Sequence, residues 1–449
     1  MAKETNMKIE VNDFGPIRNG AIELKPLTVL IGPNNSGKSY VSTLIHSLYN
    51  SFYRLWFHSL FTYMKYGIDT KLIEIKSSEI PDITKKLIRV IENQMVEEIK
   101  NGLESSYSCR VSNLVRIHNR NFRIKLDQNQ SEFIIENSDN DVKIIEYPEI
   151  GDYHRIIREL IPYTSTGDDR QNSIKFRGGT LLDILLKEIF KGFSAPVHYL
   201  PAARSGILQV YKALVDEAVR NISHIGLEQR DTLRISGVVS DFVSTIIRMS
   251  SEEGPFYKLA CELEEEIIDG TIVMKNLEKY RYPDIEYEYK GSSIPLHRAS
   301  STVSELAPLI LFLKFVIIPG DTLIIEEPEA HLHPQNQSIL AKYLARLIRK
   351  NVNLIITTHS EFLLEKLSNF IMLSTVDREK RTEKYGYPEE DYLLPEEVSV
   401  HVFSLDKEEG TIIEKVRITR EEGVPQEEFL RVHESLYDET YRLYMDIEK

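Results

Sequence analysis

A glycine-rich turn near residue 32 constrains the fold of this chain more than any other feature. It follows the apolar run Leu27 to Ile31 and has the sequence Gly32-Pro-Asn-Asn-Ser-Gly37-Lys38-Ser39. In the pattern G-x-x-x-x-G-K-[ST], the glycines let the backbone curl so that successive N–H groups converge on phosphate oxygens, and the following helix adds its positive amino-terminal end. A buried strand, a phosphate-binding turn and a helix, in this order, predict an α/β fold built on a parallel sheet.

The side chains of this turn predict its ligand. Lys38 would supply a positive charge to the β- and γ-phosphates of a nucleotide, and the hydroxyl of Ser39 would bind Mg²⁺. The other predicted nucleotide-binding residues are Gly32, Asn34, Asn35, Ser36, Gly37 and Tyr40. A glycine turn in front of an ordinary helix is the alternative, but the pattern arises by chance in roughly one chain of this length in a hundred.

A second apolar run ends in two carboxylates, at Asp321-Thr-Leu-Ile-Ile-Glu326-Glu327-Pro328. Acidic pairs usually lie on a solvated face, but this pair caps a buried strand at the end where open α/β sheets bind ligands. We therefore predict that Glu326 reaches Mg²⁺ through water and that Glu327 is catalytic, polarising the water that attacks the γ-phosphate.

A third apolar run, Val352 to Thr358, is followed by His359. A lone histidine is usually a surface or core residue. Here the predicted helix Asn336 to Lys350 separates it from the acidic pair, as a β-α-β unit requires. Because a neutral imidazole at this position can sense or stabilise the γ-phosphate, we predict a catalytic role for His359.

These motifs together resemble a known family. The runs Glu326-Glu-Pro-Glu-Ala-His-Leu-His-Pro334 and Thr357-Thr-His-Ser360 are similar to the ABC-type ATPases related to SMC and RecF proteins. Phe14-Gly-Pro-Ile17 and His198-Tyr-Leu-Pro-Ala-Ala-Arg-Ser205 resemble the stand-alone ATPases allied to the overcoming-lysogenization-defect (OLD) family. The resemblance implies an ABC-type P-loop ATPase head with a mixed sheet and an amino-terminal β-lobe, ATP and Mg²⁺ as cofactors, and a head-to-head homodimer or higher homo-oligomer that closes on ATP.

The family also implies a site completed by a second subunit. In its members, a serine and one or two glycines at a helix start contact the γ-phosphate of the opposite subunit. Ser300-Ser301-Thr302 occupies that place and would be the trans signature, although Ser301 and Thr302 fill the glycine positions. Thr302-x-x-Glu305 is also a capping box, which predicts a helix start. Arg204, just past a strand, is expected to reach the nucleotide or the neighbouring subunit.

The positions of the motifs divide the chain into five parts. Residues 1–50 begin the ATPase lobe, with a helix predicted from Tyr40 to Tyr49, and residues 51–178 form an insertion that is helical and then β. A helical arm and strands in 179–300 lead back to the head, where 301–372 hold the signature helix, the acidic pair and the histidine. Residues 373–449 form an acidic carboxy-terminal β/α extension. It is predicted to comprise a linker (Asp377 to Glu397), two strands (Val398–Leu405 and Thr411–Ile418) and a helix (Gln426 to Ile447).

Composition restricts the partners. The net charge of −14 argues against a surface built uniformly for DNA, because affinity for nucleic acid comes mainly from Lys and Arg. A local basic face is still allowed, and its candidates are Arg110, Arg116, Arg120, Arg123 and Lys125. Two isolated cysteines fit a cytoplasmic protein, and the longest apolar run, Leu306 to Ile318, is too short to cross a membrane.

Three classes of function follow. The favoured one is an ATP-hydrolysing switch that senses a trigger and controls a separate effector, a nuclease or toxin. It is implied by the resemblance to ATPase subunits of anti-phage systems such as the phage anti-restriction-induced system. The segment after Met372 is too small for the nuclease domain of OLD-type nucleases, so that chemistry is expected on another polypeptide. A RecF-like DNA-binding repair ATPase is the alternative. A transporter subunit is disfavoured, since it would need a glycine-rich signature.

Overall fold

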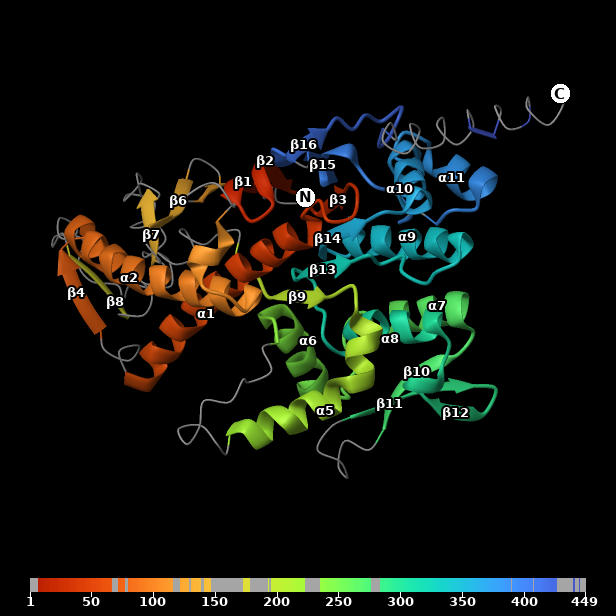
Figure 1. The fold of residues 1–449 in the computed structure, drawn as a ribbon, viewed down its shortest axis with the longest axis horizontal. Coiled ribbons are helices and arrows are strands. Elements are labelled where there is room, and N and C mark those ends of the chain that lie inside the picture. Colours follow the sequence, from red (N-terminus) through yellow and green to blue (C-terminus); the bar gives the residue numbers. More distant parts are fainter. Residues whose placement is uncertain are drawn as a thin grey trace.

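The computed structural model has a mixed α/β architecture dominated by one large sheet (Figure 1). It describes residues 7–66, 72–76, 80–115, 122–128, 131–138, 141–146, 173–177, 193, 195–222, 235–275, 283–388, 390–406, 408–425, 439, 440 and 444. Arg116, Arg120 and nearly all of the predicted helix from Gln426 to Ile447 lie outside the described residues.

Eleven strands of the described chain form the main sheet, in the order β7-β6-β5-β1-β2-β16-β15-β3-β14-β13-β9. Their bounds are β1 Met7–Phe14, β2 Ile17–Leu24, β3 Leu27–Ile31, β5 Arg123–Gln128, β6 Ser131–Ser138, β7 Asp141–Glu146, β9 Val197–Leu200, β13 Thr322–Glu326, β14 Asn353–Thr358, β15 Val398–Asp406 and β16 Gly410–Val416. The run from β7 to β2 is antiparallel, whereas β15, β3, β14, β13 and β9 run parallel. This mixed sheet with an amino-terminal β-lobe confirms the predicted fold class.

Helices cover both faces of the sheet (Figure 1). The helices of the described residues are α1 Lys38–Tyr66, α2 Ile80–Tyr107, α5 Arg204–Ile222, α6 Gly237–Arg248, α7 Tyr257–Ile268, α8 Ser301–Phe315, α9 Pro334–Arg349, α10 Glu361–Leu373 and α11 Arg378–Tyr385, of which α11 has no buried residue. Alternate residues of a strand face opposite layers. Leu30 and Ile324 pack in the core that contains α1 and α2, and their neighbours Val29 and Ile325 pack in the core that contains α8, α9 and α10.

Two smaller sheets lie apart from the main one. A three-stranded sheet contains β10 Thr271–Lys275, β11 Asp284–Tyr289 and β12 Ser292–Pro295, and a two-stranded sheet contains β4 Leu72–Lys76 and β8 Ser173–Arg177. Short 3-10 helices occur at η3 Val111–Leu114, η5 Leu296–Arg298 and η6 Pro395–Glu397. A buried ion pair between Lys314 and Glu264, 2.7 Å long, ties α8 to α7.

The organisation differs from the sequence-based expectation in several places. α1 continues to Tyr66, so the expected boundary after residue 50 falls inside a helix. Strand β5 of the insertion pairs with β1 and thereby extends the ATPase sheet. The expected carboxy-terminal extension contributes β15, which lies beside β3 at the centre of the head, and its expected linker contains α11. Pairing between strands so distant in the chain depends on tertiary contacts that local patterns do not contain.

Candidate active site

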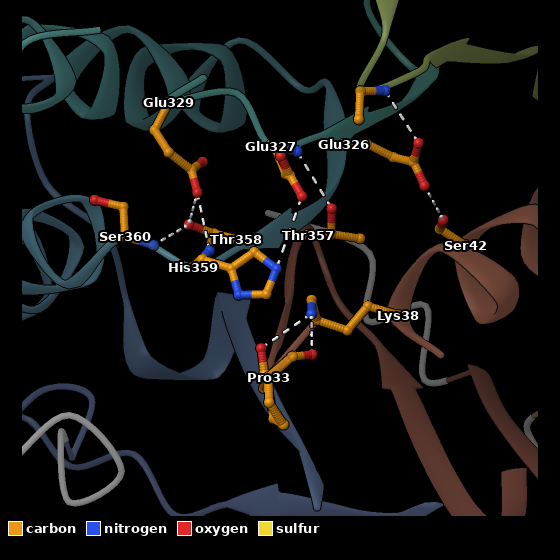
Figure 2. Close-up of polar contacts among 12 residues, drawn as sticks. Pro33, Lys38, Ser42, Glu326, Glu327, Glu329, Thr357, Thr358, His359 and Ser360 are labelled. Carbon is orange, nitrogen blue, oxygen red and sulfur yellow. Dashed lines mark hydrogen bonds and ion pairs between the residues drawn. The ribbon is translucent and has the colours of Figure 1, made fainter. Parts of the chain in front are cut away.

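Three neighbouring parallel strands bring the predicted site residues to one edge of the sheet (Figure 2). β14 lies between β3 and β13, with Thr358 opposite Ile31 and Thr357 opposite Glu326. The phosphate-binding turn follows β3, the acidic pair ends β13 and His359 follows β14. All three features therefore lie at the carboxyl ends of parallel strands, where open α/β sheets bind ligands.

The backbone of the phosphate-binding turn requires its glycines. Gly32 and Gly37 have φ angles of 145° and 94°, and Asn35 is left-handed at 62°. A Cβ at Gly32 would lie 2.6 Å from the carbonyl oxygen of Phe403 on β15, so the neighbouring strand leaves no room for a side chain. Turns with alternating backbone handedness can point successive N–H groups at one anion, which matches the predicted role of this segment.

Lys38 begins α1 and folds back over the turn (Figure 2). Its Nζ donates to the carbonyl oxygens of Gly32 at 2.9 Å and Pro33 at 2.8 Å. An ammonium has three donors, so one of them makes no hydrogen bond with the described residues. Burial lowers the pKa of Lys38 to about 8, while the three nearby glutamates oppose that change. The geometry thus holds a positive charge at the turn with one donor directed at neither carbonyl.

The other residues predicted to bind nucleotide differ in exposure. The exposed ones are Asn34, Asn35 and Ser39, whereas Ser36 is buried. The ring of Tyr40 packs in an aromatic cluster, with ring centroids 5.1 Å from Phe14 and 4.5 Å from Tyr107. Since this packing uses the Tyr40 side chain in the core, the prediction for Tyr40 is restricted to its backbone at the start of α1.

Glu326 lies at the end of β13 and is 7% exposed. Its Oε2 accepts from the backbone N–H of Ala202 at 3.0 Å, and its Oε1 accepts from the hydroxyl of Ser42 at 3.4 Å. Carboxylate oxygens have further lone pairs, so capacity for a metal-bound water remains. Mg²⁺ prefers oxygen ligands and is usually held by one or two protein groups with waters and phosphate oxygens. Glu326 and the exposed hydroxyl of Ser39 fit this donor set.

Glu327 and His359 form the more open part of the site. Glu327 has a left-handed φ of 43°, a conformation that is uncommon outside glycine and that clusters at functional sites. Its N–H donates to the carbonyl and hydroxyl oxygens of Thr357 at 2.9 and 3.2 Å. The Oε1 of Glu327 lies 3.7 Å from Nε2 of His359, and the side chains are 42% and 33% exposed. Burial, and then Lys38, lower the pKa of His359 against the opposing effect of Glu327, which favours the neutral imidazole.

Glu329 is a site residue that sequence reasoning missed. Its Oε1 accepts from the hydroxyl of Thr358 at 2.6 Å and from the backbone N–H of His359 at 2.9 Å (Figure 2). Burial raises the pKa of this carboxyl. Glu329 therefore fixes the segment that carries His359. Its sequence signal is a third acid placed two residues beyond the predicted catalytic pair, after Pro328.

The expectation for Arg204 is wrong. The residue is 2% exposed, and its guanidinium donates to the carbonyl oxygens of Glu326 at 2.7 Å, Glu327 at 3.2 Å and Pro201 at 3.2 Å. It also forms an ion pair with Glu305, 3.1 Å long. An arginine can satisfy several carbonyl groups at once, and the end of β13 presents such groups. Arg204 thus braces the acidic pair against α8 from inside the head.

The start of α8 also differs from the capping-box prediction. Ser300 is the N-cap, and its hydroxyl accepts from the N–H of Val303 at 3.3 Å. The hydroxyl of Thr302 donates instead to the carbonyl oxygen of His331 at 2.9 Å, and Glu305 pairs with an arginine. Ser300 and Ser301 are exposed, whereas Thr302 is half-buried. Contact of these three residues with a second subunit stays a prediction.

Further observations concern contact with DNA, membranes and metal ions. Arg110 is exposed, and Arg123 lies 3.5 Å from Glu136, which offsets part of the basic charge expected there. Within the described ranges, no helix is long and apolar enough to cross a membrane. Cys109 and Cys261 are free cysteines, and the described residues contain no cluster of three or more His, Cys, Asp or Glu side chains able to hold a metal.

A phosphate-binding turn, an acidic pair and a histidine on neighbouring parallel strands define a P-loop ATPase head. Residues 7–364 match the AAA_15 family, described as an AAA ATPase domain, and the chain belongs to that family. The match includes the turn, the acidic pair and His359 and ends before α10 is complete.

Comparisons with individual proteins identify more distant likenesses. The chain is 27% identical to Endonuclease GajA of Bacillus cereus (strain HuB5-5) over 407 residues, which cover 80% of this chain and 56% of that protein. It therefore spans little more than half the length of that relative. Among solved structures it is similar to the SmcHead bound to the C-winged helix domain of ScpA, with a TM-score of 0.42, 12% identity and coverage of 92% of this chain and 98% of the other. The SMC head domain from Thermotoga maritima has a TM-score of 0.35, with 12% identity and the same 92% and 98% coverage.

Proposed function

We propose that this protein is an ATP-hydrolysing switch whose turnover controls a separate effector protein. The observation that carries the ATPase part is the meeting of Lys38, Glu326, Glu327 and His359 at the carboxyl ends of β3, β13 and β14. A nucleophile-orienting acid, a phosphate-binding cation and a neutral hydrogen-bond donor in one exposed place are the parts that phosphoryl transfer needs. Membership of an AAA ATPase family supports the same reaction.

In the proposed reaction, water attacks the γ-phosphorus of ATP, the bond from that atom to the β–γ bridging oxygen breaks, and ADP and phosphate leave. Glu327 orients the water and takes up its proton. Lys38 and the N–H groups of the turn balance the charge on the β- and γ-phosphates, and His359 donates a hydrogen bond to the γ-phosphate. Ser39 and Glu326 would hold Mg²⁺, which supplies further neutralisation of the phosphate charge.

We further propose that two copies close head to head over ATP. Ser300, Ser301 and Thr302 would contact the γ-phosphate held by the partner subunit. The exposure of Ser300 and Ser301 and the amino-terminal end of α8, a 15-residue helix, support an anion contact at this place. Closing on ATP and opening after hydrolysis would give the switch two states.

The proposed role is defence against phage, with the switch holding or releasing a nuclease or toxin on another polypeptide. The motif resemblance to stand-alone ATPases of the OLD-related group supports this role. The similarity to a protein named as an endonuclease supports an effector that cuts nucleic acid. The alternative is a RecF-like repair ATPase. The effector experiment described below distinguishes the two functions.

The ATPase proposal is tested with purified wild-type protein, Glu327→Gln and Lys38→Ala. Glu327→Gln should bind ATP normally but hydrolyse it at least about 100-fold more slowly, because it removes the general base. Lys38→Ala should lose ATP binding. As a matched control, Glu365→Gln on the exposed side of α10 should change neither property. Unchanged turnover in Glu327→Gln would contradict the catalytic assignment, and normal ATP binding by Lys38→Ala would contradict the phosphate site.

The effector proposal is tested by native mass measurement of Glu327→Gln protein, purified with ATP from cells that also carry the flanking genes. A stoichiometric second polypeptide on a closed homo-oligomer is expected. A bare dimer, or a dimer that carries DNA alone, would overturn the effector proposal, and the second outcome would favour the repair ATPase.

A further inference from the structure

A cleft of about 590 Å³ is lined by residues of α1, β9, α6 and the end of α8. Figure 1 shows where these elements lie, at the β9 edge of the main sheet. The cleft is built from different residues than the candidate active site. Its volume falls within the range of small-molecule sites, about 300–1,000 Å³. The residues that line it divide into a polar wall, a cationic end and an apolar wall.

The polar wall is centred on Asp241 of α6. Its Oδ2 accepts from the side-chain amide of Asn50 at 2.8 Å and lies 3.6 Å from Nε2 of His46. Its Oδ1 lies 3.9 Å from Arg54. Burial lowers the pKa of His46 to about 3, so this imidazole adds no positive charge at pH 7. Because the side chain of Asp241 is 37% exposed, its oxygens can accept hydrogen bonds from a bound molecule.

The cationic end is Arg248, in the last turn of the same helix. It lies seven positions after Asp241, which places both on one side of α6 and about 10 Å apart along the helix axis. Arg248 is exposed and makes no ion pair with any residue in the described part of the chain. The cleft therefore offers acceptors at one end and a positive charge at the other.

The apolar wall is formed by Phe242, Met249, Phe315 and Val316. Phe242 and Met249 are buried, so the half-buried Phe315 and Val316 offer most of the apolar surface. Phe242 is held in place by stacking on Phe312, with ring centroids 5.9 Å apart and planes at 19°. A planar ring of a ligand can pack against such a surface, because contact between aromatic rings and apolar side chains buries apolar area.

We propose that this cleft binds a small anionic ligand with a planar heterocycle, the chemistry of a nucleoside monophosphate. Its exocyclic N–H groups would donate to Asp241, its ring would lie against the apolar wall, and its phosphate would pair with Arg248. In protein–DNA complexes, carboxylates accept hydrogen bonds from exocyclic amino groups of bases, and the guanidinium of arginine matches the geometry of a phosphate.

The cleft is connected to the candidate active site through α1 and β9. Helix α1 begins with Lys38 and carries His46 and Asn50 into the cleft. Tyr199 of β9 lines the cleft, and its hydroxyl lies 2.8 Å from that of Ser42, which in turn donates to Glu326 at 3.4 Å. Ligand in the cleft should therefore alter ATP turnover, and this second part rests on the proposed function.

Binding is tested by calorimetry with the full chain carrying Glu327→Gln and saturated with ATP and Mg²⁺. The four ribonucleoside 5′-monophosphates are titrated separately, and at least one should bind at one equivalent. Asp241→Asn and Arg248→Ala should each weaken that binding at least about tenfold, equal to about 1.4 kcal/mol. Asp284→Asn, on β11 and outside the cleft, is the matched control. No binding by any of the four, or binding that survives both substitutions, would overturn the proposal.

Two further variants separate this proposal from the ATPase proposal. In Lys38→Ala protein, the monophosphate should still bind, since Lys38 lies outside the cleft. In Ser42→Ala protein, the affinity should persist while the effect of the ligand on ATP turnover is lost. The titration reads heat alone, so a protein without ATPase activity would still give a decisive result. An equal effect on turnover in wild-type and Ser42→Ala protein would overturn the connection through Ser42.

Discussion

At the residue scale, the buried carboxyl of Glu329 controls the position of the more exposed His359. Its Oε1 accepts hydrogen bonds from the hydroxyl of Thr358 and the N–H of His359, so it positions the segment that carries His359. In Glu329→Ala, both donors lose their acceptor, which should cost about 1–3 kcal/mol of stability for each unsatisfied group. We expect ATP turnover to fall about tenfold while the affinity for ATP is kept.

The matched variant is Glu329→Gln, which keeps an acceptor oxygen in the same place and removes the charge. It should restore most of the stability and of the turnover. Thermal unfolding and steady-state kinetics of the two variants provide the measurement. If Gln were as harmful as Ala, the negative charge rather than the positioning of His359 would be responsible.

At the scale of elements, a buried ion pair ties α8 to α7. Lys314 is 1% exposed and donates to Glu264 at 2.8 Å and to the carbonyl oxygen of Ile272 at 3.0 Å. Lys314→Met should lower the free energy of unfolding by about 3–5 kcal/mol, because it leaves the buried Glu264 carboxylate without an opposite charge. Urea unfolding measures this loss.

A double variant distinguishes an unpaired charge from lost packing. Glu264 also accepts from the backbone N–H of Ile272 at 2.6 Å, so Glu264→Gln keeps that acceptor and removes the charge. Lys314→Met with Glu264→Gln should recover most of the stability lost in the single variant. A single variant within about 0.5 kcal/mol of wild type would show that α8 does not depend on this pair.

The elements that sequence patterns located well are those with local signals. The turn at Gly32 to Ser39 lies between β3 and α1 as predicted, and β14 lies within the apolar run Val352 to Thr358. The sequence predicts the start of α8 to within two residues, but the capping box points to Thr302 whereas the cap is Ser300, because serine and threonine are both favoured at N-caps. Which hydroxyl turns inward depends on His331, a contact that only the folded chain provides.

At the scale of the whole molecule, the head is completed by both ends of the described chain. β15 lies between β3 and β16, and β16 pairs with β2, so the carboxy-terminal strands join the amino-terminal β-lobe to the parallel strands. The same topology brings Phe403 against Gly32 of the phosphate-binding turn. Local patterns identified the two strands but not their place, since alternation of apolar residues says which face is buried and not which strand is the neighbour.

The assembly of two heads is expected to depend on Ser300. This residue is the N-cap of α8 and is also proposed to contact the partner subunit's γ-phosphate. Glycine at an N-cap costs only a few tenths of a kcal/mol, whereas alanine costs about 1 kcal/mol. In a Glu327→Gln background with ATP, Ser300→Gly and Ser300→Ala should both weaken the dimer. Of these two substitutions, only Ser300→Ala should clearly lower the melting temperature.

Analytical ultracentrifugation with and without ATP measures the dimer, and Lys38→Ala, which should not bind ATP, gives the monomer reference. The two substitutions differ in their effect on the helix and agree in removing the hydroxyl. A loss of dimer common to both therefore comes from the hydroxyl itself and not from fraying of α8. If Ser300→Gly protein dimerised on ATP as well as its parent, Ser300 would be a helix cap alone, and the contact across the interface would have to come from Ser301 or Thr302.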